Sequence, residues 1–419
     1  MSPKRALKTL EDAERYLLSL ELFGMRFGLD RMHKLTTVLG MPQRRFASIH
    51  VVGSNGKSST TRMIAAILER HGLRTGTYTS PHLRSFAERI EVRERPLDGP
   101  SFAAAVERAA HAARMVDRTL DEDDRVTQFE ALTAAAYTEL ARGGVEVAVI
   151  EAGLGGRYDA TNVIPSRVQV LTAVGLEHTR WLGPTLTDIA GEKLDVVRDH
   201  ATLVVGELPE EADAVARRVA SERHARLVRA PLEAEVPRRA PGAFQRRNFA
   251  VARTAAEAFL GELDSDAVRR AADEVVVPGR MQVVGDDPLV VYDGAHNPSG
   301  AAALAESLPE VVGERRPVVG VVAVLDDKDA AGMLQALAPR FDHIVFTRSA
   351  HPRSLPPGTL LALSEHVGGP AAEIVPAPHA GVERARELAG AAGAVIVTGS
   401  IYLIADLVRE QGAARASAL

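Results

Sequence analysis

The chain contains no cysteine among its 419 residues. Disulfides, thiolate metal sites and a cysteine nucleophile are therefore excluded. No run approaches the roughly 18 apolar residues that a membrane-spanning helix needs. The first twenty residues are rich in charge and lack the apolar core of a signal peptide. We therefore expect a cytoplasmic protein that does not enter a membrane.

An excess of positive charge is missing as well. The chain has 50 Lys and Arg against 55 Asp and Glu, a net charge of −5. This balance gives no electrostatic case for nucleic-acid binding. Hydrophobic residues make up 46% and charged residues 25%, which is typical of a globular protein. The length exceeds one ordinary core and predicts two or three domains.

The most informative stretch is residues 51–60, Val-Val-Gly-Ser-Asn-Gly-Lys-Ser-Ser-Thr. An apolar run before it predicts a strand, and a helical pattern follows it. A glycine-rich turn in this position offers backbone N–H groups and a helix N-terminus to phosphate, while Lys57 neutralises charge. Only Ser54 and Asn55 separate Gly53 from Gly56, where the common P-loop has four residues. We predict a phosphate-binding loop; the alternative is a plain tight turn.

Apolar runs alternate with helical patterns along the rest of the chain, which predicts a doubly wound parallel sheet. A Pro/Gly joint at 277–280 interrupts this alternation. We predict a P-loop ATPase domain over 1–281 and a smaller, Rossmann-like α/β domain over 282–419. The predicted strands are 46–52, 74–78, 145–150, 168–174, 203–205, 289–292, 318–324, 343–346 and 395–397. The predicted helices are 7–23, 29–39, 60–71, 101–117, 127–142, 185–197, 210–223, 245–260, 299–308, 330–337, one near 360, and 382–388.

Several polar side chains follow predicted strands, where doubly wound sheets bind ligands. Glu151 follows a buried strand, as an oxygen ligand of Mg²⁺ would, and Ser80 and His178 are further candidates. Lys193 lies within a predicted helix. Its spacing alone favours a surface lysine paired with Glu192 or Asp188.

Three segments together form a highly specific sequence signature of one protein family. They are Ser-Pro-His-Leu at 80–83, Leu-Gly-Gly-Arg-Tyr-Asp-Ala-Thr-Asn at 154–162, and Asp-Gly-Ala-His-Asn-Pro at 293–298. With them the chain resembles the folylpolyglutamate synthase/dihydrofolate synthase family of the Mur ligase superfamily. Matching pieces cover nearly the whole chain in the same order. The family loop usually reads Gly-Thr-Asn-Gly-Lys-Gly-Ser, so Ser54 and Ser58 are departures from it.

The resemblance implies an ATP-dependent ligase that activates a carboxylate as an acyl phosphate and joins it to the amine of L-glutamate. The acids would be dihydropteroate, reduced folates or both, and the protein a monomer. Two alternatives stay open. One is a Mur-type ligase acting on another acid, such as a muramyl peptide, and the other is a nucleotide-binding regulatory module.

The resemblance also implies roles for individual residues. ATP would contact the loop residues and three others: Gly53, Ser54, Asn55, Gly56, Lys57, Ser58, Ser59, Asn248, Arg280 and Asp293. Mg²⁺ would be held by Ser80, Glu151 and His178, and the catalytic residues would be Lys57, Lys193 and His296, with Lys193 carbamylated. Phe129 and Asp159 would bind the pterin, and Ser400 would bind the incoming glutamate. Alternatives remain for three of these. Phe129 could be a core residue and Asp159 a turn or cap former. Ser58 and Ser59 compete for the loop hydroxyl, and the family pattern favours Ser59.

Overall fold

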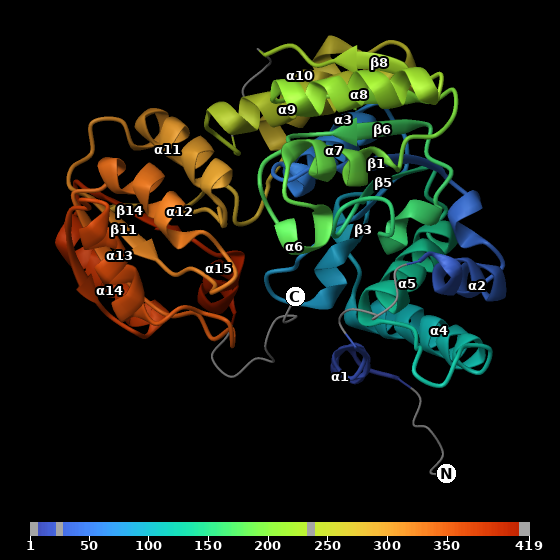
Figure 1. Ribbon diagram of the computed structural model, residues 1–419, viewed down its shortest axis with the longest axis horizontal. Coiled ribbons are helices and arrows are strands. Elements are labelled where there is room, and N and C mark those ends of the chain that lie inside the picture. Colours follow the sequence, from blue (N-terminus) through green and yellow to red (C-terminus); the bar gives the residue numbers. More distant parts are fainter. Residues whose placement is uncertain (1–6, 22–27, 233–238, 410–419) are drawn as a thin grey trace.

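The computed structural model describes residues 7–21, 28–232 and 239–409. They form two α/β domains, each built on its own sheet, of eight and six strands (Figure 1). The predicted fold class is confirmed. The boundary between residues 281 and 282 stays a prediction. Within the described ranges, no helix has the length and apolar character to cross a membrane.

The larger sheet has the strand order β4-β3-β2-β5-β1-β6-β7-β8. Six strands run parallel, and β3 and β4 form an antiparallel edge. Strand β1 lies between β5 and β6, so the ends of these three strands are neighbours. The strands are β1 Ala47–Val52, β2 Thr75–Tyr78, β3 Ile90–Val92, β4 Arg95–Pro96, β5 Val147–Glu151, β6 Val168–Leu171, β7 Thr202–Val205 and β8 Arg226–Arg229.

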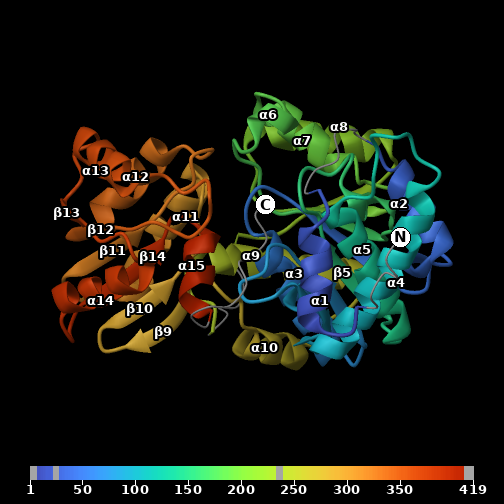
Figure 2. The ribbon, with the colours of Figure 1, turned by 90° about the horizontal axis from the view of Figure 1, so that it is seen from below.

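Helices cover both faces of this sheet (Figures 1 and 2). Alternate residues of β5 face opposite cores. Ala148 and Ile150 pack with α4 (Gly99–Asp117) and α5 (Gln128–Arg142), whereas Val147 and Val149 pack with α3 (Lys57–Arg70) and α9 (Ala243–Leu260). Burial on both faces explains the continuous apolar run of this strand. The remaining helices are α1 Leu10–Leu18, α2 Asp30–Val38, α6 Thr179–Leu182, α7 Leu186–Leu194, α8 Glu210–Glu222 and α10 Ser265–Glu274, with short 3₁₀ turns η1 Pro42–Arg44, η2 Phe86–Arg89 and η3 Ala160–Val163.

The smaller sheet has the order β13-β12-β11-β14-β10-β9, with only β9 antiparallel among its described strands. Helices α11, α12 and α13 cover one face, and α14 and α15 cover the other. The strands are β9 Gln282–Asp286, β10 Leu289–Tyr292, β11 Val318–Val322, β12 His343–Phe346, β13 Ala371–Ile374 and β14 Ala394–Thr398. The helices are α11 Pro298–Val312, α12 Ala330–Leu337, α13 Pro357–His366, α14 Pro378–Ala389 and α15 Ile401–Val408, with a 3₁₀ turn η4 Ala338–Arg340.

The structure adds elements that the sequence patterns did not predict: β3, β4, β8, β9, β13, α6, α10, α15 and the 3₁₀ turns η1–η4. Three of the four edge strands, β8, β9 and β13, are half-exposed along their length, so they lack an apolar run. The helix predicted over 7–23 is shorter, Leu10–Leu18, and positions 22 and 23 lie outside the described residues.

His50 on β1 is a buried titratable group in the centre of the sheet. Its Nε2 lies 2.8 Å from Thr161 Oγ1, and Nδ1 has no hydrogen-bond partner among the described residues. Burial, with a smaller contribution from Arg198, lowers the pKa of His50 to about 3. As pH falls below about 6.5, the unfolded chain takes up a proton that the folded chain does not, so stability is lost toward acid pH.

We expect His50→Gln to flatten this acid loss, because glutamine keeps a polar contact with Thr161 and does not titrate. The unfolding free energy of the parent should fall more steeply than that of the variant between about pH 6.5 and 4.5. Denaturant unfolding at several pH values measures it. The control is His379→Gln, at an exposed histidine, which should keep the parental slope. Equal slopes for the parent and His50→Gln would contradict this explanation.

Candidate active site

The predicted phosphate loop connects the end of β1 to the first turn of α3, and its two glycines are required by space. Gly53 has φ +152°, and a Cβ there would lie 2.0 Å from Thr172 Oγ1. Gly56 has φ +84°, and a Cβ there would lie 2.4 Å from Asn248 Oδ1. The loop therefore packs against the end of β6 on one side and α9 on the other.

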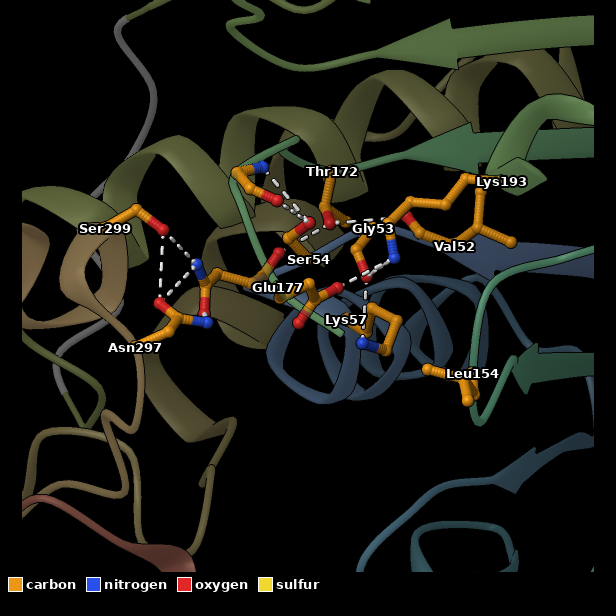
Figure 3. A network of polar contacts seen from close by, with 12 residues as sticks. Val52, Gly53, Ser54, Lys57, Leu154, Thr172, Glu177, Lys193, Asn297 and Ser299 are labelled. Atoms are coloured by element: carbon orange, nitrogen blue, oxygen red, sulfur yellow. Dashed lines mark hydrogen bonds and ion pairs between the residues drawn. The ribbon is translucent and has the colours of Figure 1, made fainter. Parts of the chain in front are cut away.

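Side chains fix the shape of this loop (Figure 3). Ser54 Oγ donates to Gly175 O and accepts from Gly175 N, both at 3.1 Å. Thr172 Oγ1 donates to Asn55 O at 2.6 Å. Lys57 Nζ donates to Gly53 O at 2.9 Å. The loop conformation is thus held by the neighbouring strand end.

Glu151 brings a carboxylate to the same place from the end of β5. Its side chain accepts from Ser58 Oγ at 2.9 Å and from Ser80 N at 3.1 Å. Burial raises the pKa of Glu151, and Lys57 partly offsets this. Ser58, rather than the buried Ser59, therefore supplies the hydroxyl that contacts the carboxylate. The hydroxyl role predicted for Ser59 stays a prediction.

Lys193 is buried, with 1% of its surface exposed, so the interpretation as a surface lysine is wrong. Its Nζ lies 2.8 Å from Glu177 Oε1 and donates to Gly53 O at 3.0 Å (Figure 3). Burial lowers the pKa of Lys193, and Glu177 opposes this. Burial alone would raise the pKa of Glu177, but Lys193 and Lys57 outweigh it and hold the pKa at about 2.

The glycine turn after β5 explains how a helix lysine reaches this site. A Cβ at Gly156 would lie 2.5 Å from Lys193 O, and Arg157 N donates to Glu192 O at 3.0 Å. The turn therefore sits directly on the last residues of α7. This close approach aims Lys193 at the phosphate loop.

His178 follows Glu177 and has a left-handed backbone with φ +46°. Burial, and then the charge of Lys328, lowers the pKa of His178 to about 4, so the imidazole is neutral near pH 7. Within the described ranges, no three His, Asp or Glu side chains gather closely enough to bind a metal by themselves. Mg²⁺ does not require such a cluster, because it accepts hydroxyl, water and phosphate oxygens beside one or two carboxylates. Ser58, Ser80 and Glu151 fit that donor chemistry.

The second domain contributes the turn that follows β10. Asp293 is buried and accepts from Met281 N at 2.8 Å and Ala295 N at 2.9 Å. Arg280 Nη1 donates to Gly294 O at 2.8 Å, and His296 Nδ1 lies 3.0 Å from the same oxygen. Burial, with Arg280, lowers the pKa of His296 to about 4. The turn thus presents a neutral imidazole.

The residues predicted to bind pterin lie at the loop after β5. A Cβ at Gly153 would lie 2.6 Å from Phe129 Cζ, and the Phe129 ring centroid is 6.0 Å from that of Tyr78. Asp159 accepts from Leu154 N at 2.8 Å and from Thr161 N at 3.0 Å and Thr161 Oγ1 at 2.5 Å. Asp159 is therefore the cap former of η3. Three bonds leave about one of its roughly four acceptor positions, so its ligand role stays a prediction.

Ser400 is buried at the N-terminus of α15, where its Oγ accepts from Tyr402 N at 3.2 Å. Asn248 Nδ2 donates to Gln245 Oε1 at 3.0 Å, beside Gly56. The nucleotide role of Asn248 and the glutamate role of Ser400 stay predictions.

A cavity of about 650 Å³ lies elsewhere, lined by residues that precede β1, β6, β7 and β8. It therefore lies at the amino-terminal ends of these strands, at the opposite end of the sheet from the phosphate loop. Three of its four arginines are already engaged: Arg198 donates to Asn162 O, Arg157 pairs with Glu192, and Arg223 pairs with Asp199. None of the predicted site residues lines it.

Sequence reasoning missed three residues near the site. Glu177 is the ion-pair partner of Lys193, and Asn297 bonds to the phosphate loop. Lys328 pairs with Asp327 at 3.1 Å and adds positive charge near His178 and His296. The position of Glu177 directly before His178, and of Asn297 directly after His296, was the available signal.

Comparison with known proteins supports the same picture. The model of the Mur ligase middle domain matches residues 51–255, and that of the Mur ligase glutamate ligase domain matches residues 279–401. The dihydrofolate synthase/folylpolyglutamate synthase of Mycobacterium tuberculosis is 35% identical over 81% of this chain and 78% of its own. The Bacillus subtilis protein of the same name is 30% identical over 95% of this chain and 98% of its own.

Solved structures agree. Mycobacterium tuberculosis folylpolyglutamate synthase complexed with ADP superposes with a TM-score of 0.88, 32% identity, and 95% and 97% of the two chains covered. Escherichia coli FolC in complex with DHPP and ADP gives a TM-score of 0.86, 29% identity, and 97% and 98% coverage.

Two α/β domains that meet over a phosphate loop with this short glycine spacing define a Mur-type, ATP-dependent ligase. Within that class, the chain belongs to the dihydrofolate synthase/folylpolyglutamate synthase family. The resemblance inferred from the three motif segments is thereby confirmed.

We expect Gly56→Ala to weaken ADP binding by at least about 10-fold, because the added methyl meets Asn248 and the left-handed backbone disfavours alanine. The matched control is Gly72→Ala. Gly72 has a similar φ of +87° but nothing within 4 Å of an added Cβ. Titration calorimetry with ADP compares the two. An equal loss of affinity in both variants would contradict a specific role for Gly56.

Proposed function

We propose that the protein forms an amide bond between L-glutamate and the carboxylate of dihydropteroate, of reduced folates, or of both, at the expense of ATP. The observation that carries this proposal is the cluster of buried Lys193 and Glu151 with half-buried Lys57 and the Lys193-paired Glu177 around the phosphate loop, to which the second domain adds His296. A relative named dihydrofolate synthase/folylpolyglutamate synthase, and another solved with DHPP and ADP, support it. None of the relatives named above is named for a different acid.

In this proposal the ATP phosphates lie along Gly53–Ser59, with Lys57 as the neutralising cation. Asn248 and Arg280 help to bind the part of the nucleotide beyond the phosphates. Asp293 contributes by holding the turn that follows β10. The boundary proposed at 281/282 then separates the ATP-binding domain from a glutamate-ligase domain. One chain supplies both halves of the site, so we propose a monomer.

Ser80, Glu151 and His178 would hold Mg²⁺, and Ser58 is a further hydroxyl ligand. A Yersinia pestis relative, 30% identical, was solved with AMPPNP and a Mn ion. When bound, the metal reduces the repulsion between the γ-phosphate and the attacking carboxylate. His178 is neutral at pH 7 and therefore offers a lone pair.

The reaction needs two transfers. A carboxylate oxygen of the acid attacks the γ-phosphorus, the bond to the β-phosphate oxygen breaks, and ADP leaves. The neutral amine of glutamate then attacks the acyl carbon, loses a proton, and the tetrahedral adduct expels inorganic phosphate. Lys57 stabilises charge on the transferred phosphoryl group, and the neutral His296 is available to accept a hydrogen bond from the amine.

Lys193 is proposed to react with CO₂. The ammonium first loses a proton, the neutral amine then adds to the carbon, and a second proton leaves the nitrogen, so that an anionic carbamate replaces the cationic lysine. Burial favours this because it lowers the pKa of Lys193 and raises the neutral fraction.

Carbamylation predicts a ¹³C resonance in protein equilibrated with ¹³C-labelled bicarbonate that is missing in Lys193→Ala. The matched control is the exposed Lys34→Ala, which should keep the signal. A labelled resonance of equal intensity in Lys193→Ala would contradict the assignment, and its absence from all three proteins would exclude the carbamate.

The function predicts that ADP release requires an acid and L-glutamate together. We expect dihydropteroate, tetrahydrofolate or both to stimulate ADP release in the presence of glutamate, and Lys57→Ala to reduce it at least about 100-fold. Lys34→Ala serves as the control and should retain the parental rate. Coupled ADP assays measure these rates. No stimulation by either acid, or full activity of Lys57→Ala, would refute the proposal.

A further inference from the structure

The side chain of Asn55 joins the phosphate loop to the second domain. Asn55 Nδ2 donates to Asn297 Oδ1 at 3.2 Å, and Asn297 Nδ2 donates to Asn55 Oδ1 at 3.2 Å. Asn55 Nδ2 also lies 2.9 Å from Ser299 Oγ. Figure 3 shows Asn297 and Ser299 beside the phosphate loop, with dashed lines for these contacts. The reciprocal pair spans 242 positions of sequence.

Asn297 is firmly held on its own side. It is the N-cap residue of α11, and its Oδ1 accepts from Gly300 N at 2.7 Å and from Ser299 Oγ at 3.1 Å. Its side chain is buried. Because Asn297 follows His296 directly, the position of Asn297 fixes the position of that imidazole. The amide pair therefore connects the phosphate loop to His296 through one peptide bond.

A second contact brings the same surfaces together. A Cβ at Gly175 would lie 2.7 Å from Ser299 Oγ, so the backbone there touches the start of α11. Gly175 is in turn bonded to Ser54 in the phosphate loop. The phosphate loop thus meets the second domain directly through Asn55 and indirectly through Gly175, and both contacts lie at the N-terminus of α11.

The loop does not need the Asn55 side chain for its own shape. Its backbone is held by Ser54, Thr172 and Lys57, and Thr172 bonds to the carbonyl oxygen of Asn55, not to its amide. Removing the Asn55 amide therefore leaves the phosphate cradle formed while it breaks the connection to Asn297.

The ion pairs between α9 and α11 are a different kind of contact between the domains. Arg246 and Arg247 on α9 pair with Glu310 and Glu306 on α11 at 2.6 and 2.7 Å, on partly exposed surface. Exposed ion pairs contribute little because water competes for both partners. These pairs also do not touch the phosphate loop.

We infer that Asn55 and Asn297 are positioning residues, whose amide pair aligns the phosphate loop with the turn that carries His296. This inference rests on the proposed function, in which the phosphoryl group and the amine meet between these two elements. Its consequence is that the pair acts on turnover rather than on nucleotide affinity. A displacement of about 1 Å between reacting groups can lower a rate about 100-fold.

Two variants distinguish the loss of the Asn55–Asn297 amide pair from the loss of the N-cap of α11. Asn297→Ser keeps an oxygen suited to an N-cap but is too short to reach Asn55, and Asn55→Ala removes the other half of the pair. We expect each to lower kcat about 10- to 100-fold. The Kd for ADP should change less than about 3-fold, because the loop binds phosphate through backbone N–H groups that neither substitution removes. The double variant should lose no more than the worse single variant, because the same pair is lost once.

The control is Glu306→Gln, which weakens the Arg247 ion pair at the same domain junction without touching the loop. It should keep kcat within about 3-fold of the parent. Multiplying losses in the double variant, a loss confined to ADP affinity, or an equal loss in Glu306→Gln would overturn the inference.

Hydrogen exchange provides a readout that needs no turnover and so separates this inference from the proposed function. Asn297→Ser should speed amide exchange at residues 53–56, and Asn55→Ala should speed it at residues 299 and 300. Glu306→Gln should leave exchange at residues 53–56 unchanged. Parental exchange at both segments in the two asparagine variants would refute the connection, whatever acid the enzyme uses.

Discussion

In the protein with unmodified Lys193, the ion pair between Lys193 and Glu177 is the interaction on which the site depends. It is buried, it is bonded to the carbonyl oxygen of Gly53, and it joins α7, the loop after β6 and the phosphate loop. Lys57 adds a second cation and Glu151 a second buried carboxylate. Removing one member of such a pair leaves an uncompensated buried charge, which costs about 3–5 kcal/mol. The catalytic charges are therefore also structural ones.

The fold makes this charge cluster accessible to a nucleotide. Strand β1 lies between β5 and β6, so the loops that follow these three strands are neighbours at their carboxyl-terminal ends. Glycine is needed where those loops touch, because Gly53 and Gly56 leave no room for a side chain. The second domain then adds His296 through the turn after β10. Neither domain alone contains the phosphate loop and this imidazole.

Local sequence patterns predicted the strands that are buried on both faces and the site residues that directly follow a strand. Strands β5 and β6 read as apolar runs because both faces are covered, and Glu151 was found because it ends one of them. The half-exposed strands β8, β9 and β13 left no such pattern. Spacing favoured a surface position for Lys193, and only the packing of Gly156 on α7 shows why it is buried. Partners as distant as Asn55 and Asn297 leave no local pattern.

The central claim is that a carboxylate is activated by phosphorylation and then joined to glutamate. The most direct measurement uses dihydropteroate or tetrahydrofolate labelled with ¹⁸O in the reacting carboxylate. Activation through an acyl phosphate predicts that one labelled oxygen appears in the inorganic phosphate released with each amide formed. Unlabelled phosphate, with amide formed at the normal rate, would contradict the account.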